Sequence, residues 1–412
     1  MKIINFRKEF LLFLLLYFSL LVGFIFNEDS TGGSYNDFVG RIHQTEFFLK
    51  DFWSVLYNYD SYGDRHSPIQ FFIFTFLKKI NIEWNTIRFV NLHLMLLCIL
   101  FFYKILELKF SAIDKKFLLL IPFIFFLSPS FRSLSIWPDS RLIGFFFFIL
   151  STYFFIKSEK HKDLSYVYLN VFFVALASYF SLNFSLFSIY FFYKFYLRFK
   201  FSHNLYFIVI LNIILALPAF YYIFILKIFF MFSAGTPGVN SEEILSLQLN
   251  IFNKILIISS IIFFYFIPFV LSKNVEIIVK KIKLSEFLFV VILFIVCIFY
   301  FNYQVEFTGG GIFFKFSNII LKNNYFFLLI SFISLIYFFL FCKKNFNNFL
   351  IFILLLLSNP QLTIYHKYFD PLVFFLIFSL LNIDFKENFF NKKNFSILYV
   401  YYSIFLVINL FK

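Results

Sequence analysis

The sequence predicts an all-α integral membrane protein with about 11–13 transmembrane helices and a long first extracytoplasmic loop that carries interfacial helices. Of the 412 residues, 61% are hydrophobic and 14% are charged, whereas a soluble domain carries about 25% charged residues. The net charge of +14 resides mostly in short loops between apolar runs. There it indicates topology, so no nucleic-acid partner is expected.

The apolar runs define the predicted spans. A crossing helix needs about 20 apolar residues, and shorter runs are accommodated by tilt or local thinning of the bilayer. No repeat or low-complexity linker marks a second domain, so residues 1–412 are expected to form a single polytopic transmembrane domain. The predicted spans lie near residues 10–26, 86–103, 117–128, 142–156, 166–181, 184–197, 206–230, 254–272, 287–301, 324–341, 348–358, 371–383 and 395–411.

Loop charge predicts a cytoplasmic N-terminus. With that orientation the Lys-rich loops fall inside, as the positive-inside rule requires, and most loops assigned outside are acidic. The first run could instead be a signal peptide, but it is long for one and no small-residue cleavage pattern follows it. We therefore interpret it as a retained span, and we expect the protein in a bacterial inner membrane.

The first outside loop, residues 27–85, is far longer than an ordinary connection between helices. Apolar groups at helical spacing over Phe38–Tyr57 predict a helix on the membrane surface, and the short apolar segment Pro68–Leu77 is expected there too. Glu28 and Asp29 open the loop. Adjacent carboxylates repel, which raises the pKa of at least one unless cations or hydrogen bonds compensate. A solvated boundary pair is the alternative interpretation.

The second outside loop places Asp139 between Arg132 and Arg141. Two interpretations stay open. The acid belongs to a functional site, or it forms a salt-bridged helix boundary, with Pro138 setting the start of the next helix.

Two later outside loops, residues 302–323 and 359–370, carry further candidates. The run Gly309-Gly310-Gly311 lets backbone approach a ligand or form an amide nest for an anion, unless it is only a flexible turn. His366 and Lys367 are cations on an otherwise acidic side. They indicate phosphate pairing or, alternatively, pairing with Asp370 or lipid headgroups.

The layout resembles the polytopic glycosyltransferases of the GT-C fold, such as the protein mannosyltransferases and the lipid A aminoarabinose transferases. The resemblance covers roughly residues 1–200 and depends on short motifs. These are Glu28-Asp29, the turn His66-Ser67-Pro68 followed by the Arg-containing segment Trp84–Asn91, and Trp137-Pro138-Asp139. The chain departs from the family pattern in its Glu-Asp order and in having no basic residue inside the fifth or sixth span.

The resemblance implies a hexosyl- or pentosyltransferase that takes a sugar from a polyprenyl phosphate. The acceptor, a glycan, lipid or protein, would come from the outer side, and membrane lipids would surround the site. Asp29 is expected to be the general base with a modestly raised pKa, and Glu28 is the alternative base. Asp139 would orient the acceptor or the base.

Cations must stabilise the departing lipid phosphate. For this task we expect Lys367 and His366 first, then Arg65, Lys315 and Arg141. No cofactor is expected; the outer carboxylates would accept a divalent cation, but no ligand spacing requires one. The residues expected to position substrate are Asp37, His66, Gly309, Gly310 and Tyr365.

Two other functions remain open. A polyprenyl-linked glycan polymerase or ligase would use Arg-rich outer loops, but these loops are mostly acidic. A lipid-glycan transporter would carry charged groups near the bilayer midplane, but the spans are nearly free of charge, with Lys227 the main exception.

Overall fold

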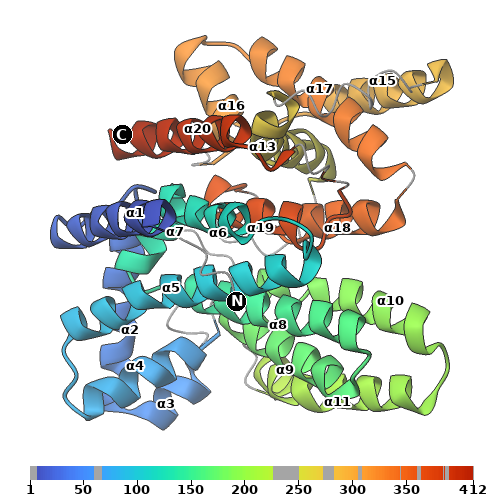
Figure 1. The fold of residues 1–412 in the computed structure, drawn as a ribbon. Helices are drawn as coiled ribbons and strands as arrows, with labels where there is room; N and C mark the ends of the chain where they lie inside the picture. The colour runs from blue at the N-terminus through green and yellow to red at the C-terminus, as the bar shows by residue number, and fades with distance from the viewer. Residues whose placement is uncertain are drawn as a thin grey trace. The chain divides into compact units, whose positions relative to one another are not determined.

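The computed structural model describes residues 7–59, 67–225, 250–271, 283–304, 309–343, 345–359, 363–383, 385 and 389–411. Within these ranges every regular element is a helix (Figure 1). The chain divides into two compact units: Met1–Ser246 with Tyr402–Lys412, and Leu247–Tyr401. The single polytopic domain over residues 1–412 stays a prediction.

The predicted class, a helical membrane protein, is confirmed. The described residues include seven helices long and apolar enough to cross a membrane. They are α1 (Arg7–Ile25), α5 (Trp84–Lys109), α8 (Ser140–His161), α11 with η4 (His203–Ile225), α13 (Ile251–Leu271), α17 (Tyr325–Cys342) and α20 (Lys392–Leu410).

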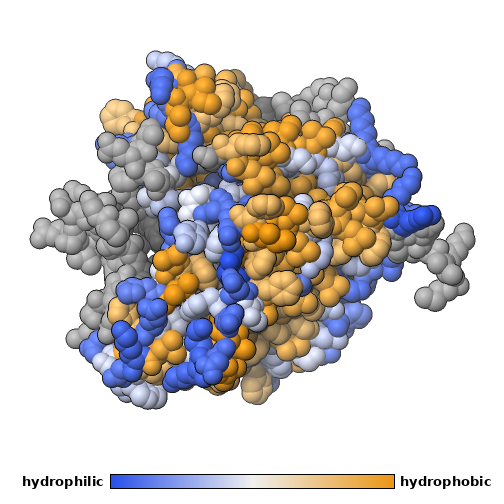
Figure 2. Space-filling view, turned by 90° about the vertical axis from the view of Figure 1, so that its left-hand side faces the viewer, coloured by the Kyte–Doolittle hydropathy of each residue, from blue (hydrophilic) through white to orange (hydrophobic). Residues whose placement is uncertain are grey.

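The surfaces of these helices are strongly apolar. On α1, Leu15 and Phe18 are 62% and 64% exposed, and Ile213 and Leu217 on α11 are similarly open. Broad hydrophobic areas cover much of the face in Figure 2. Apolar patches of this extent would be unfavourable in water and mark contact with lipid.

The remaining predicted spans are shorter helices. Three have 10–17 residues: α9 (Leu164–Phe180), α15 (Leu284–Phe299) and α18 (Phe346–Leu357). A further apolar helical segment, Gly311–Ile320, lies where a loop over residues 302–323 was predicted. Helix α10 (Phe187–Phe199) has 13 residues and lies at the sixth predicted span. The prediction of one crossing helix over 371–383 is wrong, because α19 (Leu372–Phe378) has only seven residues, about 10 Å of helix.

The first loop folds into three helices: α2 (Ser34–Lys50), α3 (Phe52–Tyr57) and α4 (Ile69–Lys79). The single helix predicted over Phe38–Tyr57 is interrupted at Asp51, whose backbone is extended. The Asp51 carboxylate accepts the Ser54 amide at 3.0 Å and so begins a new helix. The three helices share a buried hydrophobic cluster, which includes Phe48, Val55, Leu56, Tyr59 and Phe71.

One of the candidate spans is broken by a sharp bend. Helix α6 (Lys115–Phe123) continues as a 3₁₀ turn to Leu127, and α7 (Pro129–Ile136) then bends away by 69°. Ser128 caps α7 by accepting the Phe131 amide at 3.1 Å. All eight residues of α7 are buried, although several are polar, so their side chains must find partners inside the protein.

Helices α8 and α9 are joined by a buried amide. The Asn170 side chain donates to the Ser151 carbonyl and hydroxyl oxygens at 2.9 and 2.7 Å. Ser151 Oγ lies 3.1 Å from the Asn170 carbonyl and donates to it. Polar side chains commonly join helices in membranes this way.

Candidate functional site

The site begins where α1 ends. Asn27 has a left-handed φ of 55°, and its amide donates to the Phe24 carbonyl at 3.3 Å. The Glu28 amide donates to the Gly23 carbonyl at 2.8 Å. These two bonds form a Schellman motif, which ends the helix and turns the chain back on itself. The Glu28 side chain consequently folds over Gly23.

Glu28 forms a closed ion pair with Arg132 of α7. Arg132 Nε donates to Glu28 Oε1 at 2.8 Å, and its Nη2 donates to Oε2. The side chains are only 7% and 3% exposed. Arg132 also donates to the Ser19 carbonyl at 3.0 Å, so it binds the last turns of α1 as well. The Glu28 charge is therefore fully committed.

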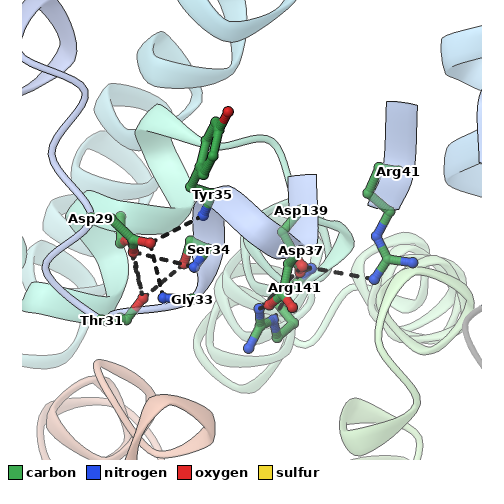
Figure 3. A network of polar contacts seen from close by, with 10 residues as sticks. Asp29, Thr31, Gly33, Ser34, Tyr35, Asp37, Arg41, Asp139 and Arg141 are labelled. Atoms are coloured by element: carbon green, nitrogen blue, oxygen red, sulfur yellow. Dashed lines mark hydrogen bonds and ion pairs between the residues drawn. The ribbon is translucent and has the colours of Figure 1, made fainter. Parts of the chain in front are cut away.

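Asp29 anchors the start of α2. Its carboxylate accepts the backbone amides of Gly33 at 2.8 Å, Ser34 at 3.2 Å and Tyr35 at 3.2 Å (Figure 3). These are orphan donors of the first helical turn. A negative charge there also interacts favourably with the helix dipole.

Two hydroxyls complete the Asp29 site. Ser133 of α7 donates to Oδ1 at 2.8 Å, and Thr31 donates to the same oxygen at 3.2 Å. Burial acts to raise the pKa of Asp29, but the hydrogen bonds from Ser133 and from the α2 amides outweigh it, and the net pKa is lowered. The expectation of a modestly raised pKa is therefore wrong, because this carboxylate accepts five hydrogen bonds, which favour its charged form.

A second acidic group joins α2 to the start of α8 and contains Asp37 and Asp139 (Figure 3). Asp139 caps α8 and accepts both the amide and Nε of Arg141 at 2.8 Å. Arg141 also donates to Asp37 at 3.0 Å, and Arg41 lies 3.9 Å from Asp139. This geometry matches the salt-bridged helix boundary, with Asp139 itself capping the helix.

Sequence reasoning missed most basic and hydroxyl partners in the first unit. The loops that it singled out do converge: Trp137 of the second loop donates its indole N–H to the Glu28 carbonyl at 2.9 Å. Two of the missed residues stood out in the sequence by their charge. Arg132 is a basic residue on a side predicted to be acidic, and Arg88 is a charge inside an apolar run. Ser133 and Arg41 had no comparable signal.

The later-loop candidates belong to the second unit. His366 Nε2 lies 2.9 Å from the Tyr265 hydroxyl, and Lys367 Nζ lies 5.1 Å from the centre of the Tyr365 ring. Lys315 ends the short helix α16 (Gly311–Lys315). These contacts are distinct from those around Asp29, and the phosphate role of these residues stays a prediction.

The glycine run packs against its own chain. A Cβ on Gly309 would lie 2.8 Å from both the Ile364 carbonyl oxygen and the Tyr303 hydroxyl, and one on Gly310 would overlap Phe314. Gly310 also has a left-handed φ of 81°. The close approach that glycine permits is therefore made by protein atoms here.

Some of the predicted residues lie outside the ranges that the structure describes. They are Arg65, His66 and Lys227. Within the described residues, no group of three or more His, Cys, Asp or Glu side chains is placed to hold a metal ion.

Gly23→Ala tests the tight packing under the ion pair. A Cβ at Gly23 would overlap Glu28 Oε2 and lie 3.0 Å from Arg132 Nη2. We expect a loss of about 3–5 kcal/mol of stability, the usual effect of disrupting a buried ion pair. The control Gly40→Ala, with open space around its Cβ, should stabilise α2 by up to about 1 kcal/mol. Thermal unfolding in detergent measures both, and equal midpoints would contradict the prediction.

Comparison of the chain with protein-family models, with curated proteins and with solved structures found no match. The resemblance to the GT-C glycosyltransferases therefore stays a prediction from sequence, and the function is argued from the geometry of the site.

Proposed function

We propose that the protein is a membrane glycosyltransferase that moves a sugar from a polyprenyl phosphate to an extracytoplasmic acceptor. One observation carries the proposal. Among the site carboxylates, Asp29 is the one with no cationic partner in the described part of the chain. Glu28 is paired with Arg132, and Arg141 bridges Asp37 and Asp139. A base must keep its charge available, so we assign the role to Asp29.

The proposed step is an attack by an acceptor hydroxyl on the anomeric carbon. The new C–O bond forms as the bond between the anomeric carbon and the phosphate oxygen breaks, and the electron pair leaves with the phosphate. The hydroxyl proton passes to Asp29. A carboxylate with a lowered pKa is a weak base, which suits late proton transfer from an oxygen made acidic by its new bond. Asp29 is half-buried and firmly oriented, so it would need little rearrangement.

The other parts of the proposal come from the sequence. The N-terminus lies in the cytoplasm of a bacterial cell. The chain crosses the membrane about 11–13 times when the bent pair α6–α7 and the shorter helices are included. No cofactor is required. Lys367, His366 and Lys315 stay candidates for the donor phosphate. Arg141 is less suited to that role, because its charge is shared between two carboxylates.

A lipid-glycan transporter is the second candidate. The broken span α6–α7 favours it, since interrupted helices that present polar groups inside the membrane are typical of transporters. A transporter would move a lipid-linked sugar across vesicles without forming a glycoside. A polymerase or ligase would differ from the main proposal only in its product, an extended glycan.

The sidedness of the first loop is the first requirement. Trp53 on α3 is 63% exposed, and Lys160 near the end of α8 is exposed as well. In a background with the native cysteines replaced by serine, Trp53→Cys should react with an impermeant maleimide added to intact cells. Lys160→Cys should react only after permeabilisation. The opposite pattern would reject an outer site.

Asp29→Asn should reduce sugar transfer by about 100- to 10,000-fold, the usual contribution of a general base. Asp51→Asn is the matched control, because Asp51 caps a helix in the same loop. Each variant should lose about 1 kcal/mol or more of stability from its cap, measured by thermal unfolding in detergent. Transfer of labelled sugar from a polyprenyl phosphate in membranes separates the two. Full activity of Asp29→Asn would remove Asp29 from the mechanism.

The pH dependence should reflect the lowered pKa of Asp29. Because the folded pKa lies below the ordinary value of 3.8, the carboxylate stays charged above about pH 5 and should produce no acid limb there. Its contribution to stability is present above the unfolded pKa and is lost as pH falls through the folded pKa. Ser133→Ala removes a donor that lowers the pKa, so any acid limb should move to higher pH. An unchanged or lower limb in pH–rate profiles would contradict this assignment.

A further inference from the structure

Among the residues that the structure describes, a buried arginine beside the site has no counter-charge. Arg88 lies on the second turn of α5 and is 9% exposed. Its guanidinium donates to three neutral oxygens: Nη2 to the Asn27 side chain at 2.8 Å, Nη1 to the Asn85 side chain at 3.3 Å, and Nε to the Ile136 carbonyl at 3.3 Å. Within the described residues it takes part in no ion pair. Burying an uncompensated charge is costly, so this arrangement implies an anion from elsewhere.

The neighbouring acids do not supply that charge. Glu28 lies one residue from Asn27 but pairs with Arg132, and Asp139 pairs with Arg141. Asp29 is directed at hydroxyl and amide donors. Arg88 differs in this respect from the other three arginines of the site, all of which face carboxylates.

The surroundings of Arg88 suit a ligand that arrives from the membrane surface. Its guanidinium carbon lies 3.9 Å from the centre of the Trp137 ring and 5.0 Å from that of Phe24. Two flanking residues, Asn85 and Phe89, are exposed. The Asn85 contact is long, and the guanidinium has more N–H donors than these three acceptors use. An incoming oxyanion can therefore replace Asn85 and form a paired contact.

We propose that Arg88 binds the phosphoester group of a lipid-linked ligand. Arg88 lies near one end of a candidate span, Trp84–Lys109. The ends of a spanning helix reach the headgroups, where such a phosphate lies while its chain stays in the bilayer. The flat fork of the guanidinium fits two phosphate oxygens at once. The identity of the lipid as the sugar donor rests on the proposed function. The phosphoester site itself rests on the uncompensated charge of Arg88 and on its position near the end of α5.

Binding is tested with farnesyl phosphate and the full-length protein in detergent. In a Trp53→Phe/Trp84→Phe variant, Trp137 is the remaining tryptophan and reports on the space next to Arg88. Farnesyl phosphate should change its fluorescence saturably, whereas farnesol should not. Inorganic phosphate should bind much more weakly, since it lacks an apolar chain. A response to farnesol equal to that of farnesyl phosphate would overturn the proposal.

Variants are compared by direct binding of radiolabelled farnesyl phosphate. Arg88→Gln should weaken binding about 10- to 100-fold, the usual worth of charge-assisted hydrogen bonds. Arg88→Lys keeps the charge without the fork and should fall between. Arg198→Gln is the control, because Arg198 also contacts a backbone carbonyl, at 3.0 Å, and an aromatic ring, but is partly exposed on α10. Wild-type affinity in Arg88→Gln, or an equal loss in Arg198→Gln, would reject the site.

The outcomes separate this inference from the proposed function. Phosphatidylglycerol that competes equally with farnesyl phosphate, with the same dependence on Arg88, would support a phosphoester site filled by membrane lipid. Arg88-dependent binding without any sugar transfer would reject the transferase alone. Transfer that proceeds equally in wild type and Arg88→Gln would reject Arg88 as the donor site and leave the base assignment intact. Thermal unfolding of Arg88→Lys and Arg88→Gln in detergent excludes misfolding as the cause of lost binding.

Discussion

The buried ion pair between Glu28 and Arg132 is the constraint on which the site depends. Each partner alone would be a charge in a nearly dry environment, and removing one typically costs about 3–5 kcal/mol. Together they join the end of α1 to α7, segments far apart in sequence. The turn at Asn27 fixes the direction in which the chain leaves the pair. The position of Asp29 then follows, because it is the next residue.

From that position Asp29 organises the first loop. Its carboxylate collects the amides that begin α2 and the Ser133 hydroxyl from α7. One acid of the pair is thus used to neutralise a buried cation, and the other is surrounded by neutral donors. Because Glu28 pairs with a cation and Asp29 accepts neutral donors, the two adjacent carboxylates can both stay charged, and they differ in the partners that they bind. Arg88 lies over the Trp137 ring and, within the part of the chain that the structure describes, forms no ion pair with an acid.

The periodic part of the fold could be predicted from sequence, and the contact geometry could not. Apolar runs located the long helices because bilayer thickness sets their length. The break at Asp51 was missed, since apolar spacing continues across it and only a capping side chain interrupts the helix. The sequence placed Asp29 before Glu28 as the expected base, but it could not predict their different partners, because folding brings Arg132 and Ser133 from another loop. The short α19 shows that an apolar run need not form a single helix.

The buried amide between α8 and α9 has a mechanical consequence. Sliding or rotating one helix against the other would break the bonds between Asn170 and Ser151 together, away from any water that could replace them. These two helices should therefore move as a rigid body. The bend that follows Leu127 is also fastened, because Arg132 on α7 donates to the Phe126 carbonyl before the bend at 3.3 Å. A change of angle there would therefore disturb the arginine that holds Glu28.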